Sequence, residues 1–162
     1  MRIADCLDCY SLTLQENQLD EIGSYRVYGA NGVCGYTDSP VINGDAILIV
    51  KDGSGVGNVS FATGEYSVIG TLNYLTSKNG YNLRYIYYCL MNFNFAPYKT
   101  GMAIPHIYFK DYGKAKIYCP ALEEQDRIAN ILSKIECKIA IERSISNHYI
   151  ELKQYLLQRL FI

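Results

Sequence analysis

The sequence predicts an α+β protein, with a β-rich domain over residues 1–120 followed by one long C-terminal α-helix over residues 121–162. Two observations carry this prediction. Short runs of strand length, separated by glycine turns, fill the first region. From Leu122 to Phe161 the chain contains neither Gly nor Pro, and its apolar residues recur every three or four positions, as on one face of a helix.

The first region holds several segments with the length and composition of strands. They lie at residues 46–50, 59–62, 65–69 and 72–75. The glycine-rich stretch 51–58 connects the first two of these runs, which predicts a hairpin. One helix is expected at residues 83–93, because it can place Leu83, Ile86, Tyr87 and Leu90 on a single face.

The long C-terminal helix is expected to expose an apolar stripe. The stripe consists of Ile128, Ile131, Leu132, Ile135, Ile139, Ile145, Tyr149, Leu152, Leu156 and Leu160. About forty residues rising about 1.5 Å each make a rod of roughly 60 Å, which is too long for so small a domain to cover. We therefore expect the stripe to pair with another helix as a coiled coil. A break into two shorter helices between Ser144 and Asn147 is the alternative.

The net charge and the amino-acid composition limit the functions that the protein can have. A net charge of −1 and a pI near 6.1 exclude a protein that coats nucleic acid non-specifically, but they leave room for a reader of base edges. The 16 Tyr residues, against 5 Phe and no Trp, fit either a half-exposed sheet or a binding surface.

The sequence shows no apolar run of membrane-spanning length and no signal peptide at its start. Its six cysteines form no disulfide framework. A cytoplasmic protein is therefore expected, without a role at a membrane.

Three stretches of the sequence suggest a phosphate-binding loop, a zinc site or a hydrolase site, but each lacks features that such a site needs. Residues 53–57 (GSGVG) lack the Lys-Ser/Thr and the following helix of a phosphate-binding loop. Cys6 and Cys9 form a lone CxxC pair, whereas a structural zinc site needs a second pair. No local signature of a Cys-His hydrolase surrounds Cys34, Cys119 or His106. We expect no catalytic residues, no metal and no cofactor.

The order of motifs resembles a known family. The matching segments are residues 2–5, 25–32 (YRVYGANG), 36–37, 46–58, 101–107, 119–129 (CPALEEQDRIA) and 152–161. This ordered set is similar to that of the DNA specificity subunits of type I restriction-modification systems. The resemblance covers nearly the whole chain and corresponds to half of such a subunit.

The resemblance implies that residues 1–120 are a target recognition domain and that the helix is a spacer. A full subunit has two such domains and two such helices packed antiparallel, so the missing half would come from a second copy or another half-subunit. The implied partners are double-stranded DNA, methyltransferase (modification) subunits and, through these, restriction subunits. The implied role is to direct those subunits to a bipartite site without catalysis.

Candidate base readers are polar or aromatic residues on the expected turns. They are Asn31, Tyr36, Lys51, Asp52, Tyr98, Lys99 and His106. Lys51 and Lys99 could instead contact phosphate. The alternative function is a non-catalytic head on a coiled-coil stalk that binds a protein or a glycan, which the near-neutral charge favours.

Overall fold

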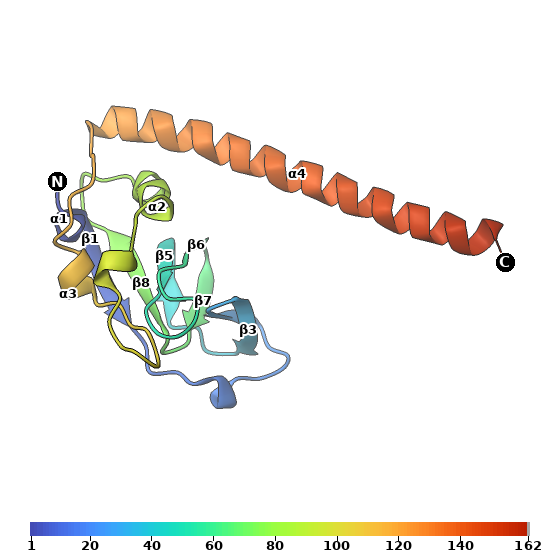
Figure 1. Ribbon diagram of the computed structural model, residues 1–162, viewed down its shortest axis with the longest axis horizontal. Coiled ribbons are helices and arrows are strands. Elements are labelled where there is room, and N and C mark those ends of the chain that lie inside the picture. The colour runs from blue at the N-terminus through green and yellow to red at the C-terminus, as the bar shows by residue number, and fades with distance from the viewer. Residues whose placement is uncertain (162) are drawn as a thin grey trace.

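Residues 1–161 are described by a computed structural model, in which a long helix leaves a β-rich head and extends far beyond it (Figure 1). The head contains two four-stranded sheets, with strand orders β1-β8-β5-β6 and β3-β2-β7-β4. The strands are β1 (Leu7–Ser11), β2 (Tyr25–Gly29), β3 (Gly32–Thr37), β4 (Ile42–Asn43), β5 (Ala46–Val50), β6 (Val59–Ala62), β7 (Glu65–Val68) and β8 (Leu72–Ser77). The helices are α1 (Ile3–Cys6), η1 (Glu16–Gln18), α2 (Leu83–Met91), η2 (Ala96–Tyr98), α3 (Phe109–Tyr112) and α4 (Leu122–Leu160).

β5 lies at the centre of the head, and all five of its residues are buried. Because side chains alternate along a strand, Ile47 and Ile49 enter a core that also contains α2. Ala46 and Leu48 enter a second core, which β2, β7 and β8 help to form. A strand buried on both faces needs an uninterrupted apolar run, and this explains the sequence of residues 46–50.

The expected strands and the hairpin are confirmed. β5 pairs antiparallel with β6, with Ala46 opposite Ala62 and Ile49 opposite Val59. β7 ends at Val68 and β8 continues to Ser77, so these boundaries differ from the expected ones by one and two residues. The expected helix at 83–93 begins at Leu83 as expected and ends earlier, at Met91; Asn82 caps its start, with a side chain that accepts a hydrogen bond from the backbone N–H of Tyr85.

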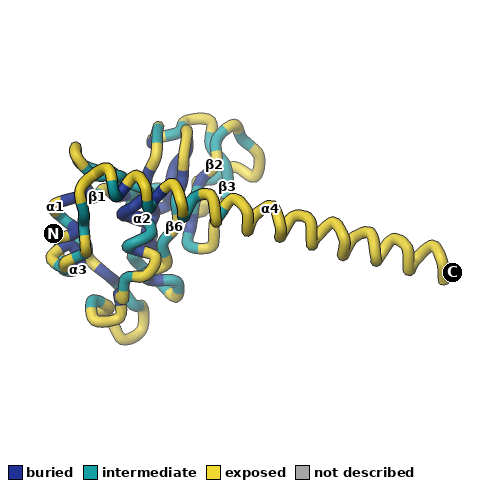
Figure 2. Tube along the Cα trace, turned by 90° about the horizontal axis from the view of Figure 1, so that it is seen from above, coloured by how far each residue is buried: buried dark blue, intermediate teal, exposed yellow. Residues whose placement is uncertain are grey.

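α4 is one continuous helix, so the alternative of a break between Ser144 and Asn147 is wrong. Only its first turns touch the head, where Gln125 and Ala129 are buried. Tyr88 of α2 donates a hydrogen bond to the Glu136 carboxylate at 2.7 Å, which adds a polar contact at the end of this junction. Every residue from Cys137 to Phe161 is exposed, as Figure 2 shows in yellow.

Candidate functional site

Two loops of the head are joined along their backbones. One follows β5 and starts at Lys51, and the other returns from η2 towards α3. The backbone N–H of Gly53 donates to the Pro105 carbonyl at 3.0 Å, and that of Ile107 donates to the Lys51 carbonyl at 2.9 Å. These bonds hold the two loops as one surface, which we call the paired loops (residues 51–58 and 99–107).

The second of the paired loops closes on itself. Thr100 and His106 exchange two backbone hydrogen bonds, of 2.9 and 2.7 Å, so residues 101–105 form a tight tip. Gly101 has a φ of +89°, and a Cβ at this position would collide with the Ile104 carbonyl oxygen. Only glycine suits this position, because the backbone is left-handed and the neighbouring carbonyl leaves no room.

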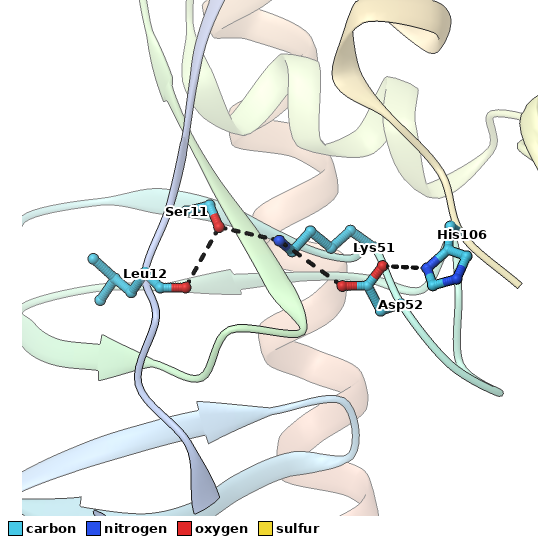
Figure 3. Close-up of polar contacts among 5 residues, drawn as sticks. All are labelled: Ser11, Leu12, Lys51, Asp52 and His106. Carbon is cyan, nitrogen blue, oxygen red and sulfur yellow. Dashed lines mark hydrogen bonds and ion pairs between the residues drawn. The ribbon is translucent and has the colours of Figure 1, made fainter. Parts of the chain in front are cut away.

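The paired loops present a polar cluster of three side chains, Lys51, Asp52 and His106 (Figure 3). His106 Nδ1 lies 2.6 Å from Asp52 Oδ1, and Lys51 Nζ lies 3.8 Å from Asp52 Oδ2. Lys51 Nζ also donates a hydrogen bond to Ser11 Oγ at 3.1 Å, which ties the cluster to the end of β1. The three side chains are 26–34% exposed, so they are held in place and still reach solvent.

The geometry of this cluster suits recognition better than catalysis. Asp52 offers carboxylate oxygens, Lys51 an ammonium donor, and His106 a ring nitrogen besides the one that faces Asp52. A serine hydrolase would need a hydroxyl bonded to the histidine, but the hydroxyl of Ser11 is bonded to Lys51 instead. Burial raises the pKa of the Cys6 and Cys9 thiols to about 11, which leaves both of them protonated and unreactive near neutral pH.

The other sequence-predicted readers are dispersed. Asn31 is exposed on the β2–β3 turn, across a hollow from Asn58 and Ser60 of the β5–β6 turn and strand β6. Lys99 is exposed next to the closed loop tip. Tyr98 is half-buried and its ring stacks on Phe93 at 5.7 Å, so it supports the loop by packing.

Tyr36 lies in a different environment. It lines a separate hollow together with the acidic residues Glu16, Asp20 and Glu21. Its backbone pairs with Asp20 through two hydrogen bonds, of 2.9 and 3.1 Å. Carboxylates at this position repel phosphate, which weakens the case for Tyr36 as a DNA contact.

The sequence interpretation missed two residues beside the cluster. The Tyr108 ring stacks on His106 with their centroids 6.4 Å apart, and Lys110 Nζ lies 5.2 Å from the Tyr108 centroid. Tyr108 is 48% exposed and extends the polar cluster with a flat aromatic surface. The alternation of His106, Tyr108 and Lys110 in the chain is the signal that could have revealed this row.

Two negative findings apply to residues 1–161. No group of three or more His, Cys, Asp or Glu side chains in this range is arranged to hold a metal ion. Of the helices in the same range, none combines the length and the apolar character needed to cross a membrane.

The fold and the loops define a class of protein: a β-rich head that presents a rigid polar surface and carries one long, exposed helix. The sequence model of the type I restriction modification DNA specificity domain matches residues 8–151. This match covers most of the chain, and the chain belongs to that family.

Two curated relatives are similar in sequence. The EcoprrI type I restriction enzyme specificity subunit of Escherichia coli is 27% identical over 112 residues, which are 69% of this chain and 28% of the relative. A putative type I restriction enzyme specificity subunit of Haemophilus influenzae is 27% identical over 116 residues, or 70% of this chain and 30% of the relative.

Solved structures share the fold. The S subunit of a type I restriction-modification system from M. genitalium superimposes with a TM-score of 0.77 at 22% identity, over 89% of this chain and 40% of that one. The HsdS subunit of Thermoanaerobacter tengcongensis gives a TM-score of 0.61 at 20% identity, over 87% and 38% of the two chains. The chain therefore spans less than half the length of each relative.

Proposed function

We propose that this chain recognises double-stranded DNA by sequence and serves as half of the specificity component of a type I restriction-modification complex. Family membership supports the class of function, and the polar cluster on the paired loops is the observation that carries it. Side chains already oriented by neighbours lose little conformational freedom when they meet a base edge. Such preorganised donors and acceptors are what readout in the major groove requires.

The loop tip adds apolar groups to this surface. Met102 is fully exposed and Ile104 is 58% exposed, so both project from the same loop that carries His106. An apolar side chain beside polar readers can contact the methyl group of thymine, which distinguishes thymine from cytosine. These two residues therefore extend the proposed readout.

The small net charge of this chain supports a model in which other subunits supply most of the phosphate contacts. With a net charge of −1, the chain has little capacity to displace counterions from phosphates on its own. Methyltransferase subunits would supply most of the phosphate contacts and the chemistry, while restriction subunits would join through them. Such an assembly would work in the cytoplasm.

The exposed apolar stripe of α4 supports pairing with another helix. Ile135, Ile145, Leu152 and Leu156 of this stripe are 43–50% exposed. Pairing along α4 with a second copy would place two heads on one duplex. Such a pair would recognise a palindromic, bipartite target.

The test is selection of bound sequences from a random duplex library, with and without a methyltransferase subunit of a type I restriction-modification system. We expect a bipartite consensus that requires the methyltransferase for full affinity. His106→Ala should relax the preference at one or two base positions in each half-site, whereas Lys153→Ala on the far part of α4 should leave the consensus unchanged. Selection that yields no consensus in either condition contradicts the proposal.

A further inference from the structure

The backbone of the paired loops holds Asp52 and His106 opposite each other. The two hydrogen bonds that join the loops, of 3.0 and 2.9 Å, lie on either side of this pair. In an antiparallel pairing, two residues flanked in this way bring their side chains closer together than two residues that bond to each other. His106 is also fixed from its other side, where its backbone exchanges two hydrogen bonds with Thr100. The side-chain contact between Asp52 and His106 is therefore imposed by the backbone.

This contact decides which ring nitrogen of His106 carries a proton. His106 Nδ1 lies 2.6 Å from Asp52 Oδ1. An ionised carboxylate can only accept hydrogen bonds, so the contact requires a proton on Nδ1. A neutral imidazole has a proton on one nitrogen only, and its other nitrogen is then an acceptor. In neutral His106 the acceptor is therefore Nε2.

The charges around the cluster favour the neutral imidazole. Lys51 Nζ lies 3.8 Å from Asp52 Oδ2, so an ammonium group already balances the carboxylate. Lys110 adds a further positive charge beside the ring of Tyr108, which stacks on His106. A charged imidazole would be a third cation beside one carboxylate, and neighbouring like charges disfavour the charged form.

Nε2 of His106 is available to a ligand. Within residues 1–161 no hydrogen bond of the protein uses this nitrogen, and part of the side chain reaches solvent. Tyr108 stacks on the face of the imidazole, with an angle of 22° between the rings, so it leaves the ring edge uncovered. Figure 3 shows the second ring nitrogen turned away from Asp52. His106 thus presents one acceptor in a fixed direction.

An acceptor of this kind discriminates between bases in the major groove. Adenine N6 and cytosine N4 carry amino groups that donate hydrogen bonds, whereas guanine and thymine present only acceptors there. Resting on the proposed recognition of DNA, we propose that Asp52 is a positioning residue, which fixes the tautomer of His106, and that His106 Nε2 therefore selects adenine or cytosine at one position of the half-site. Both carboxylate oxygens of Asp52 are engaged within the cluster, so Asp52 itself contacts no base.

Asp52→Asn tests this role because it should reverse the tautomer. The ammonium group of Lys51 only donates, so the amide oxygen of the variant faces Lys51 and its NH2 group faces His106. That NH2 group donates to Nδ1, and the ring proton moves to Nε2. In the DNA selection, under the condition that gives a consensus, the preference at one position should change from adenine or cytosine to guanine or thymine on the same strand.

The matched control is Asp8→Asn, which neutralises an aspartate that pairs with Lys78 at 3.5 Å, away from the paired loops. It should leave every position of the consensus unchanged. A purely structural role for Asp52 predicts a weaker preference at all positions, or a loss of binding, without a new base at any of them. Either of these results for Asp52→Asn would overturn the proposal.

Nitrogen-15 NMR of the full chain reports the tautomer directly, because protonated and unprotonated ring nitrogens have well-separated chemical shifts. The chain has only two histidines. His106 should carry its proton on Nδ1 in the unaltered chain and on Nε2 in Asp52→Asn. His148, whose Nδ1 lies 2.8 Å from the Ser144 carbonyl on α4, should be the same in both and serves as the internal reference. A proton on Nε2 of His106 in the unaltered chain contradicts the proposal.

Base analogues test the contact from the side of the DNA. Purine in place of the selected adenine, or 2-pyrimidinone in place of the selected cytosine, removes the amino group and little else. The unaltered chain should bind such a duplex about tenfold more weakly, as expected for one lost hydrogen bond. His106→Ala should bind both duplexes equally. Equal binding of both duplexes by the unaltered chain would also overturn the proposal.

Failure of this proposal differs from failure of the proposed function. A chain that selects no consensus in any condition removes DNA recognition and with it the role of His106. A clear consensus that Asp52→Asn leaves unchanged removes the tautomer proposal alone.

Discussion

The side-chain carbonyl of Gln125 accepts a hydrogen bond from the backbone N–H of Asn82 at 3.0 Å. Gln125 belongs to the first turn of α4, and Asn82 caps the start of α2. The amide nitrogen of Gln125 donates to the Pro120 carbonyl at 2.9 Å, and the side chain is 2% exposed. This buried amide bonds to backbone groups at the start of α2 and just before α4, and it thereby fixes the direction in which α4 leaves the head.

Replacing Gln125 should therefore weaken the junction. Gln125→Ala leaves the Asn82 N–H and the Pro120 carbonyl without partners in a buried site, and each such loss costs about 1–3 kcal/mol. We expect a lower free energy of unfolding of the head in urea denaturation. Gln158→Ala, on the exposed part of the same helix, is the matched control and should change this free energy by less than about 0.5 kcal/mol. Equal effects of the two variants would contradict this role.

Gly101 should be essential to the closed loop tip. Gly101→Ala forces a side chain into a left-handed backbone conformation and against the Ile104 carbonyl, so we expect a loss of about 1–3 kcal/mol and of sequence-specific binding. Gly80 has a similar φ of +90°, but a Cβ there meets nothing within 4 Å. Gly80→Ala therefore isolates backbone strain from collision. If both variants bind DNA equally well, the collision is unimportant.

Lys99 should contribute to phosphate contact. Its side chain is exposed beside the closed loop, whereas Lys51 is engaged by Ser11 and Asp52. Lys99→Ala should weaken binding to all sequences alike and reduce the slope of log affinity against log salt by about 1. Lys134→Ala, an exposed lysine on α4, is the control for overall charge. A change of consensus without a change of slope would instead make Lys99 a base reader.

Tyr66 carries a hydroxyl whose removal should stabilise the protein. Within the described residues its oxygen is buried without a hydrogen-bond partner, and burial raises the pKa of this phenol above its ordinary value. Tyr66→Phe removes an unsatisfied polar atom, so we expect a gain of up to about 1 kcal/mol in thermal or urea unfolding. Tyr85 donates from its hydroxyl to the Tyr118 carbonyl at 3.0 Å, and Tyr85→Phe should have the opposite effect. Destabilisation by both variants would indicate a partner for Tyr66.

The sequence was sufficient for elements that depend on local periodicity. α4 follows from helical spacing in a stretch without Gly or Pro, and β5 follows from a short apolar run between turns. The strands β2 and β3 were not predicted, because residues 25–37 mix glycines, tyrosines and polar residues without a clear alternation. The pairing of β2 with β7 is parallel, with Val27 opposite Ser67, and such a pairing between distant segments has no local signal.

In the candidate site, too, single residues could be predicted from the sequence but their arrangement could not. Turn residues identified Lys51, Asp52 and His106 separately, since loops that join rigid elements carry binding groups. Their meeting was decided by tertiary structure: His106 reaches Asp52 across 54 positions of the chain, and only the backbone bonds between the paired loops bring them together. The tertiary structure also packs the Tyr98 ring against Phe93, and it places Tyr36 in a hollow that is lined by carboxylates.

By itself, the sequence determined that a long amphipathic rod follows a β-rich head, because helical and strand periodicities are properties of a few neighbouring residues. Only the tertiary structure decided which part of the rod the head covers and which loop side chains face one another. Those relationships depend on contacts between residues far apart in the chain. Such contacts gain their free energy from the burial of apolar surface, which a short stretch of sequence does not reveal.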